Sequence, residues 1–109
     1  MKTHSLVYVT TPDREIAIQL AHGAVKAGLA ACANIIPGMT SVYQWEGRLN
    51  EDQEVVLLFK TTEEAVSDLT AFIKTRHPYK TPAVLALPVT AGNTQFLEWI
   101  SSCVTDRRG

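Results

Sequence analysis

The apolar residues of this chain follow two kinds of spacing, and each kind predicts a different element. Continuous runs of Val, Leu, Tyr and Phe predict strands at residues 5–10 and 54–60. Residues 30–46 also read as extended, and the dipeptide Pro37-Gly38 within them predicts a bent or bulged strand. The polar residues 47–52 are expected to connect this strand to the one at 54–60.

Three helices are predicted where apolar side chains recur at intervals of three and four residues. The first begins with Thr11 as N-cap and Pro12 as first helical residue, and ends at Gly28. Thr61 and Glu64 have the spacing of a capping box and open the second helix. The dipeptide Gly92-Asn93 caps the third. The expected buried faces are Ile16, Ala17, Leu20, Ala21, Ala24 and Val25, then Ala65, Val66, Leu69, Phe72 and Ile73, then Phe96, Leu97, Ile100 and Val104.

With a last strand at 82–89, the order is β-α-β-β-α-β followed by a third helix. This order is typical of an α+β, ferredoxin-like domain, in which two helices pack on one face of an antiparallel sheet. The first and third strands are then central. The prolines agree with this topology, since Pro37, Pro82 and Pro88 all fall in the two edge strands, where a missing N–H is tolerated. The length of 109 residues fits a single domain, 1–109.

The predicted central strands carry more apolar side chains than one covered face requires. Residues 55–59 (VVLLF) and 6–9 (LVYV) are apolar on both faces, whereas the two helices can cover only one. Burying a large aliphatic side chain contributes roughly 1.5–3 kcal/mol, so a second cover is expected. The simplest cover is another copy of the chain, which predicts a homo-oligomer. The alternative is that the third helix folds over the open face.

Composition narrows the class of partner. Ten Lys and Arg against eleven Asp and Glu give a net charge of -1, which argues against nucleic acid and anionic membranes as partners. No apolar run approaches the roughly 18 residues of a membrane span, and the stretch 6–9 is too short for a signal peptide. Cys32 and Cys103 have no metal-binding or disulfide spacing. A reduced, cytoplasmic protein is therefore expected.

Several spaced motifs resemble the divalent-cation tolerance family, CutA. They are VTTPDREIA at 9–17, ACANIIPGMTSVYQWEGRL at 31–49, FKTT at 59–62, HPYKTPAVLALPV at 77–89 and FLEWI at 96–100. The resemblance implies a ferredoxin-like fold assembled as a homotrimer through edge-strand pairing, with a PII-like architecture. It also implies a cytoplasmic role in heavy-metal tolerance, copper in particular.

The chain departs from the family motif at four positions. Lys80 and Ala83 stand where the family usually has glutamates, so two carboxylates suited to balancing a cation are lost. Thr10 and Arg76 stand where some relatives have a cysteine and a second histidine.

Two residues are candidates for binding copper or another divalent cation. Copper prefers soft or imidazole ligands. His77 is the one good ligand in the segment RHPYKTP, although Arg76 and Lys80 beside it repel cations. It could instead only terminate the second helix, with Tyr79 packing at a subunit boundary. Cys32 could ligate as a thiolate near the trimer seam, or be a buried structural cysteine.

A second constellation predicts a small-ligand cleft between subunits. Lys60, Trp45, Glu54 and Tyr43, with Tyr79, are its candidate residues. Lys60 would supply a point charge for an anion and Trp45 a stacking face. The simpler interpretation is a snorkelling lysine and an interface tryptophan.

Three classes of function are compared. The first is a non-enzymatic trimer that binds a metal ion or a small anionic ligand and acts through an unidentified protein partner, with no organic cofactor. The second is a small acyl-phosphate hydrolase, but Asp13 and Pro12 make the first strand-to-helix turn a poor phosphate cradle. The third is an RNA-binding sheet, which needs more aromatic and basic residues on its central strands. The first class is predicted, and no function is assigned to His4, His22 or Cys103.

Overall fold

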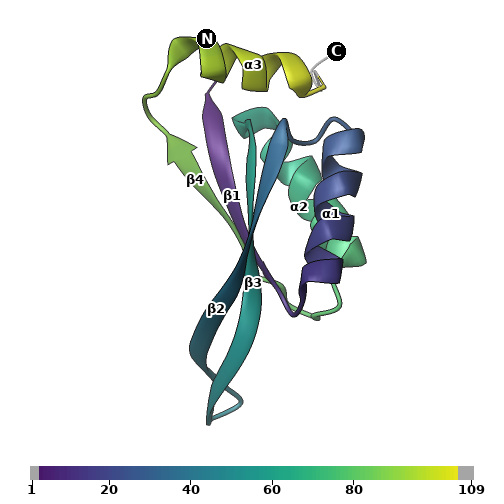
Figure 1. Cartoon of the computed structure of the whole chain (residues 1–109), viewed down its shortest axis with the longest axis vertical. Coiled ribbons are helices and arrows are strands. Elements are labelled where there is room, and N and C mark those ends of the chain that lie inside the picture. Colours follow the sequence, from purple (N-terminus) through teal and green to yellow (C-terminus); the bar gives the residue numbers. More distant parts are fainter. Residues whose placement is uncertain (1–2, 106–109) are drawn as a thin grey trace.

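Four strands and three α-helices make up the computed structural model, which describes residues 3–105 (Figure 1). In chain order they are β1 (His4–Thr11), α1 (Arg14–Lys26), β2 (Cys32–Trp45), β3 (Arg48–Thr62), a 3-10 turn (Glu63–Ala65), α2 (Val66–Arg76), β4 (Val84–Val89) and α3 (Thr94–Cys103). The predicted α+β order is confirmed. Across residues 3–105, every helix falls short of the length or apolar character that crossing a membrane demands.

The sheet is antiparallel, with the strand order β2-β3-β1-β4. The first and third strands are therefore central, as predicted. Pro37 lies in edge strand β2 and Pro88 in edge strand β4, while Pro82 precedes β4. Proline is tolerated at these positions because an edge strand leaves N–H groups unpaired.

The hairpin of β2 and β3 is longer than the sequence predicts. Residues 48–52, expected to be a connection, continue the ladder down to the pair Trp45 and Arg48. The turn is only Glu46 and Gly47, both with positive φ (51° and 76°), as in the two-residue turns that match strand twist. A non-glycine residue with positive φ is uncommon, so the polar stretch gave no signal of a tight hairpin.

The helix caps are confirmed in one case and corrected in two. Asn93 caps α3 as predicted, its side chain accepting from the amides of Gln95 and Phe96. Asp13, not Thr11, caps α1, with its Oδ1 2.9 Å from the amide nitrogen of Ile16.

Thr61 does not cap α2. Its buried hydroxyl donates to the carbonyl of Leu29 at 2.7 Å, and the chain passes through the 3-10 turn before α2 begins. Thr11 does not cap α1 for the same reason, because its hydroxyl contacts the carbonyl oxygens of Asp13 and Val55. Both threonines form hydrogen bonds that depend on tertiary packing.

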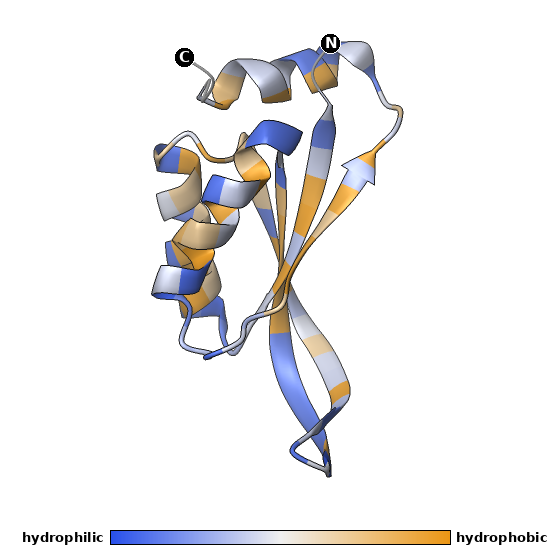
Figure 2. Ribbon diagram, turned by 180° about the vertical axis from the view of Figure 1, so that it is seen from behind, coloured by the Kyte–Doolittle hydropathy of each residue, from blue (hydrophilic) through white to orange (hydrophobic). Residues whose placement is uncertain are grey.

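The core lies between the sheet and the pair α1 and α2, which cover one face (Figures 1 and 2). Its fully buried members are Val7, Val9, Leu57 and Phe59 from the sheet, with Ala24, Leu69 and Ile73 from the helices. Register pairs Val9 with both Leu57 and Val84, so these side chains share the helix-covered face. Alternation then directs their neighbours to the opposite face.

That opposite face is left uncovered. Helix α3 crosses the end of the sheet, where Ile100 and Val104 pack with Ala31 and Ala65 (Figure 1). The alternative in which the third helix folds over the open face is therefore wrong. Large apolar side chains stay exposed on this face: Leu85 by 60%, Leu87 by 49% and Ile36 by 46%.

We expect Gly28→Ala to destabilise the protein by about 2–4 kcal/mol. Gly28 ends α1 as predicted, at φ 73°, and a Cβ there would collide with the Thr105 hydroxyl. Gly47→Ala is the matched control, because Gly47 also has positive φ but nothing lies within 4 Å of its Cβ position. That control should cost only about 1–2 kcal/mol. Denaturant unfolding at one protein concentration compares them, and equal losses would contradict a packing role for Gly28.

Candidate functional site

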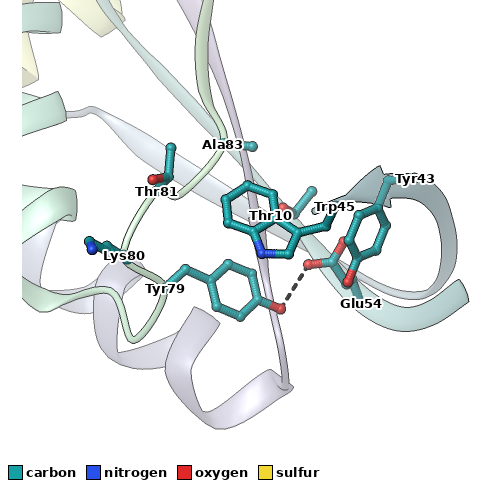
Figure 3. Close-up of a pocket in the computed structure, with 8 residues that line it drawn as sticks. All are labelled: Thr10, Tyr43, Trp45, Glu54, Tyr79, Lys80, Thr81 and Ala83. Carbon is teal, nitrogen blue, oxygen red and sulfur yellow. Dashed lines mark hydrogen bonds between the residues drawn. The ribbon is translucent and has the colours of Figure 1, made fainter. Parts of the chain in front are cut away.

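A pocket of about 370 Å³ lies between the long hairpin and the segment that joins α2 to β4 (Figure 3). It is lined by Thr10, Tyr43, Trp45, Glu54, Tyr79, Lys80, Thr81 and Ala83. Four of the five residues predicted for a small-ligand cleft are thus together. Thr81 and three of the four departures from the family motif, Thr10, Lys80 and Ala83, complete the lining.

A β-bulge explains why the hairpin contributes these residues. The register of β2 against β3 shifts between Ile36 and Met39, so that Met39 pairs with Glu54. Side chains alternate from there, and Tyr43 and Trp45 consequently lie on the same face as Glu54. Without the extra residue in β2, the alternation would turn both rings to the other face.

Glu54 is the centre of the pocket and is only 8% exposed. Its carboxylate accepts hydrogen bonds from the Ser41 hydroxyl at 2.6 Å and the Tyr79 hydroxyl at 3.0 Å. The Lys80 amine points away from it (Figure 3). A buried carboxylate needs such donors, and here neutral hydroxyls supply them. Ser41 was missed from the sequence, although its alternation with Tyr43 could have indicated it.

Both tyrosines of the pocket hold their protons more firmly than usual. Burial, followed by the hydrogen bond to Glu54 and the nearby negative charges, raises the pKa of Tyr79 to about 12. The hydrogen bond to Asp52 is the main cause that raises the pKa of Tyr43, with burial and the charges of Asp52 and Glu54 adding to it. The two phenols therefore stay neutral donors, and the pocket presents carboxylate and phenol oxygens beside the Trp45 ring.

His77 lies behind the pocket, 7% exposed, with both ring nitrogens in hydrogen bonds. Nδ1 accepts from the backbone N–H of Tyr79 at 3.1 Å, and Nε2 lies 2.7 Å from the carbonyl oxygen of Thr10. Its own backbone N–H donates to the carbonyl of Ile73 at the end of α2. His77 therefore ends α2, as predicted, and the packing of Tyr79 at a subunit boundary stays a prediction.

Cys32 and Lys60 lie away from the pocket within one chain. They are register partners near the start of β2, and Lys60 is six residues from Glu54 along β3, about 20 Å. The Lys60 amine lies 5.4 Å from the centre of the Phe96 ring, in a cation–π contact. The structure therefore separates Lys60 from the other residues of its predicted constellation, and Cys32 from His77. Cys32 and His77 as metal ligands stay a prediction.

The described residues of a single chain do not fit a copper centre. Among residues 3–105, no three His, Cys, Asp or Glu side chains converge in a way that could hold a metal ion. The pocket offers oxygen donors, which suit hard ions such as Mg²⁺ or Mn²⁺, whereas copper prefers imidazole and sulfur. A closed metal site here would need water or ligands from another subunit.

Comparison with known proteins identifies the family. Residues 5–103 match the family model described as CutA1 divalent ion tolerance protein. The chain belongs to this family. It is 45% identical to the divalent-cation tolerance protein CutA of Thermus thermophilus, across 87% of this chain and 92% of that protein.

Two solved structures of CutA proteins show the same fold. CutA1 of Oryza sativa superposes with a TM-score of 0.94 at 41% identity, covering 96% of each chain. The periplasmic divalent cation tolerance protein CutA of Archaeoglobus fulgidus gives 0.91 at 34% identity, over 94% of this chain and 99% of that one. The predicted family and α+β fold are confirmed. The relatives are named for cation tolerance and not for catalysis, which is consistent with a non-enzyme.

We expect stability to fall between about pH 10 and pH 12, partly because of Tyr79. Its pKa is raised from 10 to about 12 in the folded protein, so that the folded state keeps a proton which the unfolded state has lost. This stabilisation is complete below pH 10 and is lost as the pH rises toward 12. Unfolding followed across this range should show a shallower decline in Tyr79→Phe.

The same pocket predicts how Glu54→Gln acts on tyrosinate absorbance. Removing the carboxylate should lower the pKa of Tyr79 from about 12 toward 10, without reaching it, because burial is the largest cause of the shift. The change should persist in full in a Tyr8→Phe background and shrink in a Tyr79→Phe background to the smaller contribution of Tyr43, for which the charge of Glu54 is a minor cause of the raised pKa. Persistence in full in the latter would assign it to another tyrosine.

Proposed function

We propose that this chain forms a homotrimer that responds to divalent cations, binding a metal ion or a small ligand at clefts between its subunits without catalysing a reaction. The Glu54 pocket is the part of the cleft that each chain contributes. The observation that carries the proposal is that the pocket continues the uncovered apolar face of the sheet.

Contacts along that face support the link between assembly and site. Tyr8 lies on the open face, and its hydroxyl contacts the sulfur of Met39 at 3.5 Å. Met39 pairs with Glu54, the centre of the pocket. A second copy that covers Leu85 and Leu87 therefore also approaches the pocket edge. The number three and the PII-like arrangement come from the family resemblance.

The competing functions receive less support. A phosphate-binding hydrolase needs free amides at a helix N-terminus, but the Asp13 carboxylate already occupies the Ile16 amide of α1. An RNA-binding sheet needs several exposed aromatics and cations on its central strands, whereas the register places one of each, Tyr8 and Lys60, among aliphatic side chains on the open face. The phenols of the pocket are neutral and hydrogen-bonded to carboxylates, which disfavours a nucleophilic role.

The identity of the ion and the compartment belong to the proposal as well. Copper follows from the family resemblance, while the oxygen donors of the pocket favour a harder ion. A cytoplasmic location and an unidentified protein partner remain predictions; the relative from Archaeoglobus fulgidus is described as periplasmic.

The particle in dilute solution should have three times the 12.0 kDa mass of the chain. Leu85→Glu places a charge on the open face and should reduce that mass, as measured by sedimentation. Val25→Glu is the control. Val25 was predicted on the buried face of its helix, but it is 39% exposed on α1 and lies away from the open face of the sheet. A well-folded wild-type particle of single-chain mass would contradict the proposed assembly.

Titration with Cu²⁺, Zn²⁺ and Mn²⁺ tests the binding site. Glu54→Gln should weaken the tightest of these ions by about 10- to 100-fold, because the buried carboxylate is lost. Glu51→Gln should change nothing, since Glu51 is exposed and pairs with Val42 on the other face of the hairpin. Loss of binding in Cys32→Ser with Glu54→Gln unaffected would move the site to Cys32.

A further inference from the structure

We infer that His77 is a positioning residue: its two ring nitrogens fix Tyr79, and with it the wall of the Glu54 pocket, against strand β1. In this role the imidazole is a hydrogen-bonding bridge and not a metal ligand. The inference rests on the proposed function only in that the pocket His77 shapes is the proposed binding site.

The wall of the pocket has few attachments to the rest of the molecule. Four of its eight lining residues, Tyr79, Lys80, Thr81 and Ala83, come from the segment 78–83. Pro78 and Pro82 have no N–H to donate. Within the described chain, this segment makes two hydrogen bonds, both through Tyr79: its N–H to His77 Nδ1 and its hydroxyl to Glu54. One residue, Tyr79, therefore holds the segment at its start, and the hydrogen bond of its backbone N–H depends on His77.

The hydrogen bonds of His77 define which nitrogen carries the proton. Nδ1 accepts from the Tyr79 amide, so it has a lone pair and no hydrogen. Nε2 then carries the proton and donates it to the carbonyl of Thr10 at 2.7 Å. A metal ion binds a ring nitrogen through its free lone pair, and the single lone pair at Nδ1 is already used. Metal binding by His77 would have to release Tyr79.

Packing reinforces the bridge. The rings of His77 and Tyr79 lie with centroids 4.8 Å apart and planes tilted by 49°. Thr10, which accepts from His77, itself lines the pocket. His77 thus joins the end of β1 to the far wall, and the Tyr79 hydroxyl reaches Glu54 from that fixed position.

Nitrogen-15 NMR of the wild-type imidazoles tests the bridge directly. His77, assigned through bonds to its own backbone signals, should show an unprotonated Nδ1 and a protonated Nε2, and neither nitrogen should become metal-bound when Zn²⁺ is added. A protonated Nδ1, or the signal of a Zn²⁺-bound nitrogen in the ring, would overturn the inference. This measurement needs no variant to be stable.

Two conservative variants separate the two hydrogen bonds. The Asn oxygen in His77→Asn can still accept from the amide two residues ahead, as in an Asx turn, but cannot reach Thr10. The longer amide in His77→Gln can still donate to the Thr10 carbonyl, but gives no acceptor at the Nδ1 position. Hydrogen exchange at the Tyr79 amide should therefore accelerate about fivefold in His77→Gln and His77→Ala, and stay near the wild-type rate in His77→Asn.

Thermal stability of the same variants provides the control. A merely structural histidine would make Tyr79 exchange follow the melting temperature across all three variants. Exchange that follows stability instead of the acceptor would contradict a positioning role. If instead the NMR and exchange results hold but the wild-type protein binds none of Cu²⁺, Zn²⁺ and Mn²⁺, the metal-binding proposal fails and the role of His77 stands.

Discussion

The constraint on which this structure depends is that β1 and β3 are apolar on both faces, while the chain has helices for one. Helices α1 and α2 fully bury the side chains on one face, which are Val7, Val9, Leu57 and Phe59. The side chains between them, such as Leu58, turn to the other face, which α3 reaches only at its end. A single chain therefore buries only one of the two apolar faces of its own central strands.

The long hairpin ties that unsatisfied face to the pocket. Its bulge shifts the alternation of β2 by one residue, which turns Tyr43 and Trp45 toward Glu54. Because the same hairpin belongs to an edge of the sheet, any copy that pairs with or covers this edge also meets the pocket. The proposed assembly and the proposed ligand binding therefore use one surface, and a substitution on it is expected to change both.

The sequence predicted what local pattern controls. The glycine end of α1 and the Asn93 cap follow from residues close together in the chain, and the strand order follows from the order of the elements. The incorrect caps at Thr11 and Thr61 have a common cause, since each hydroxyl is used by a carbonyl distant in sequence. The tight hairpin was missed because Glu46 adopts a positive φ, which a glutamate in the sequence does not predict.

The sequence also predicted the candidate site only where the alternation of side chains along a strand decides it. Alternation can place Tyr43, Trp45 and Glu54 on one face once the hairpin is known, but Lys60, on the same strand, is six residues too far along it. The chemistry of the residues that do line the pocket also limits which ion could bind. A cation at Glu54 competes with the hydrogen bonds from Ser41 and Tyr79, and in drawing on the carboxylate it removes a cause of the raised Tyr79 pKa. The proposed ion binding and the protonation of Tyr79 are therefore linked through one buried carboxylate.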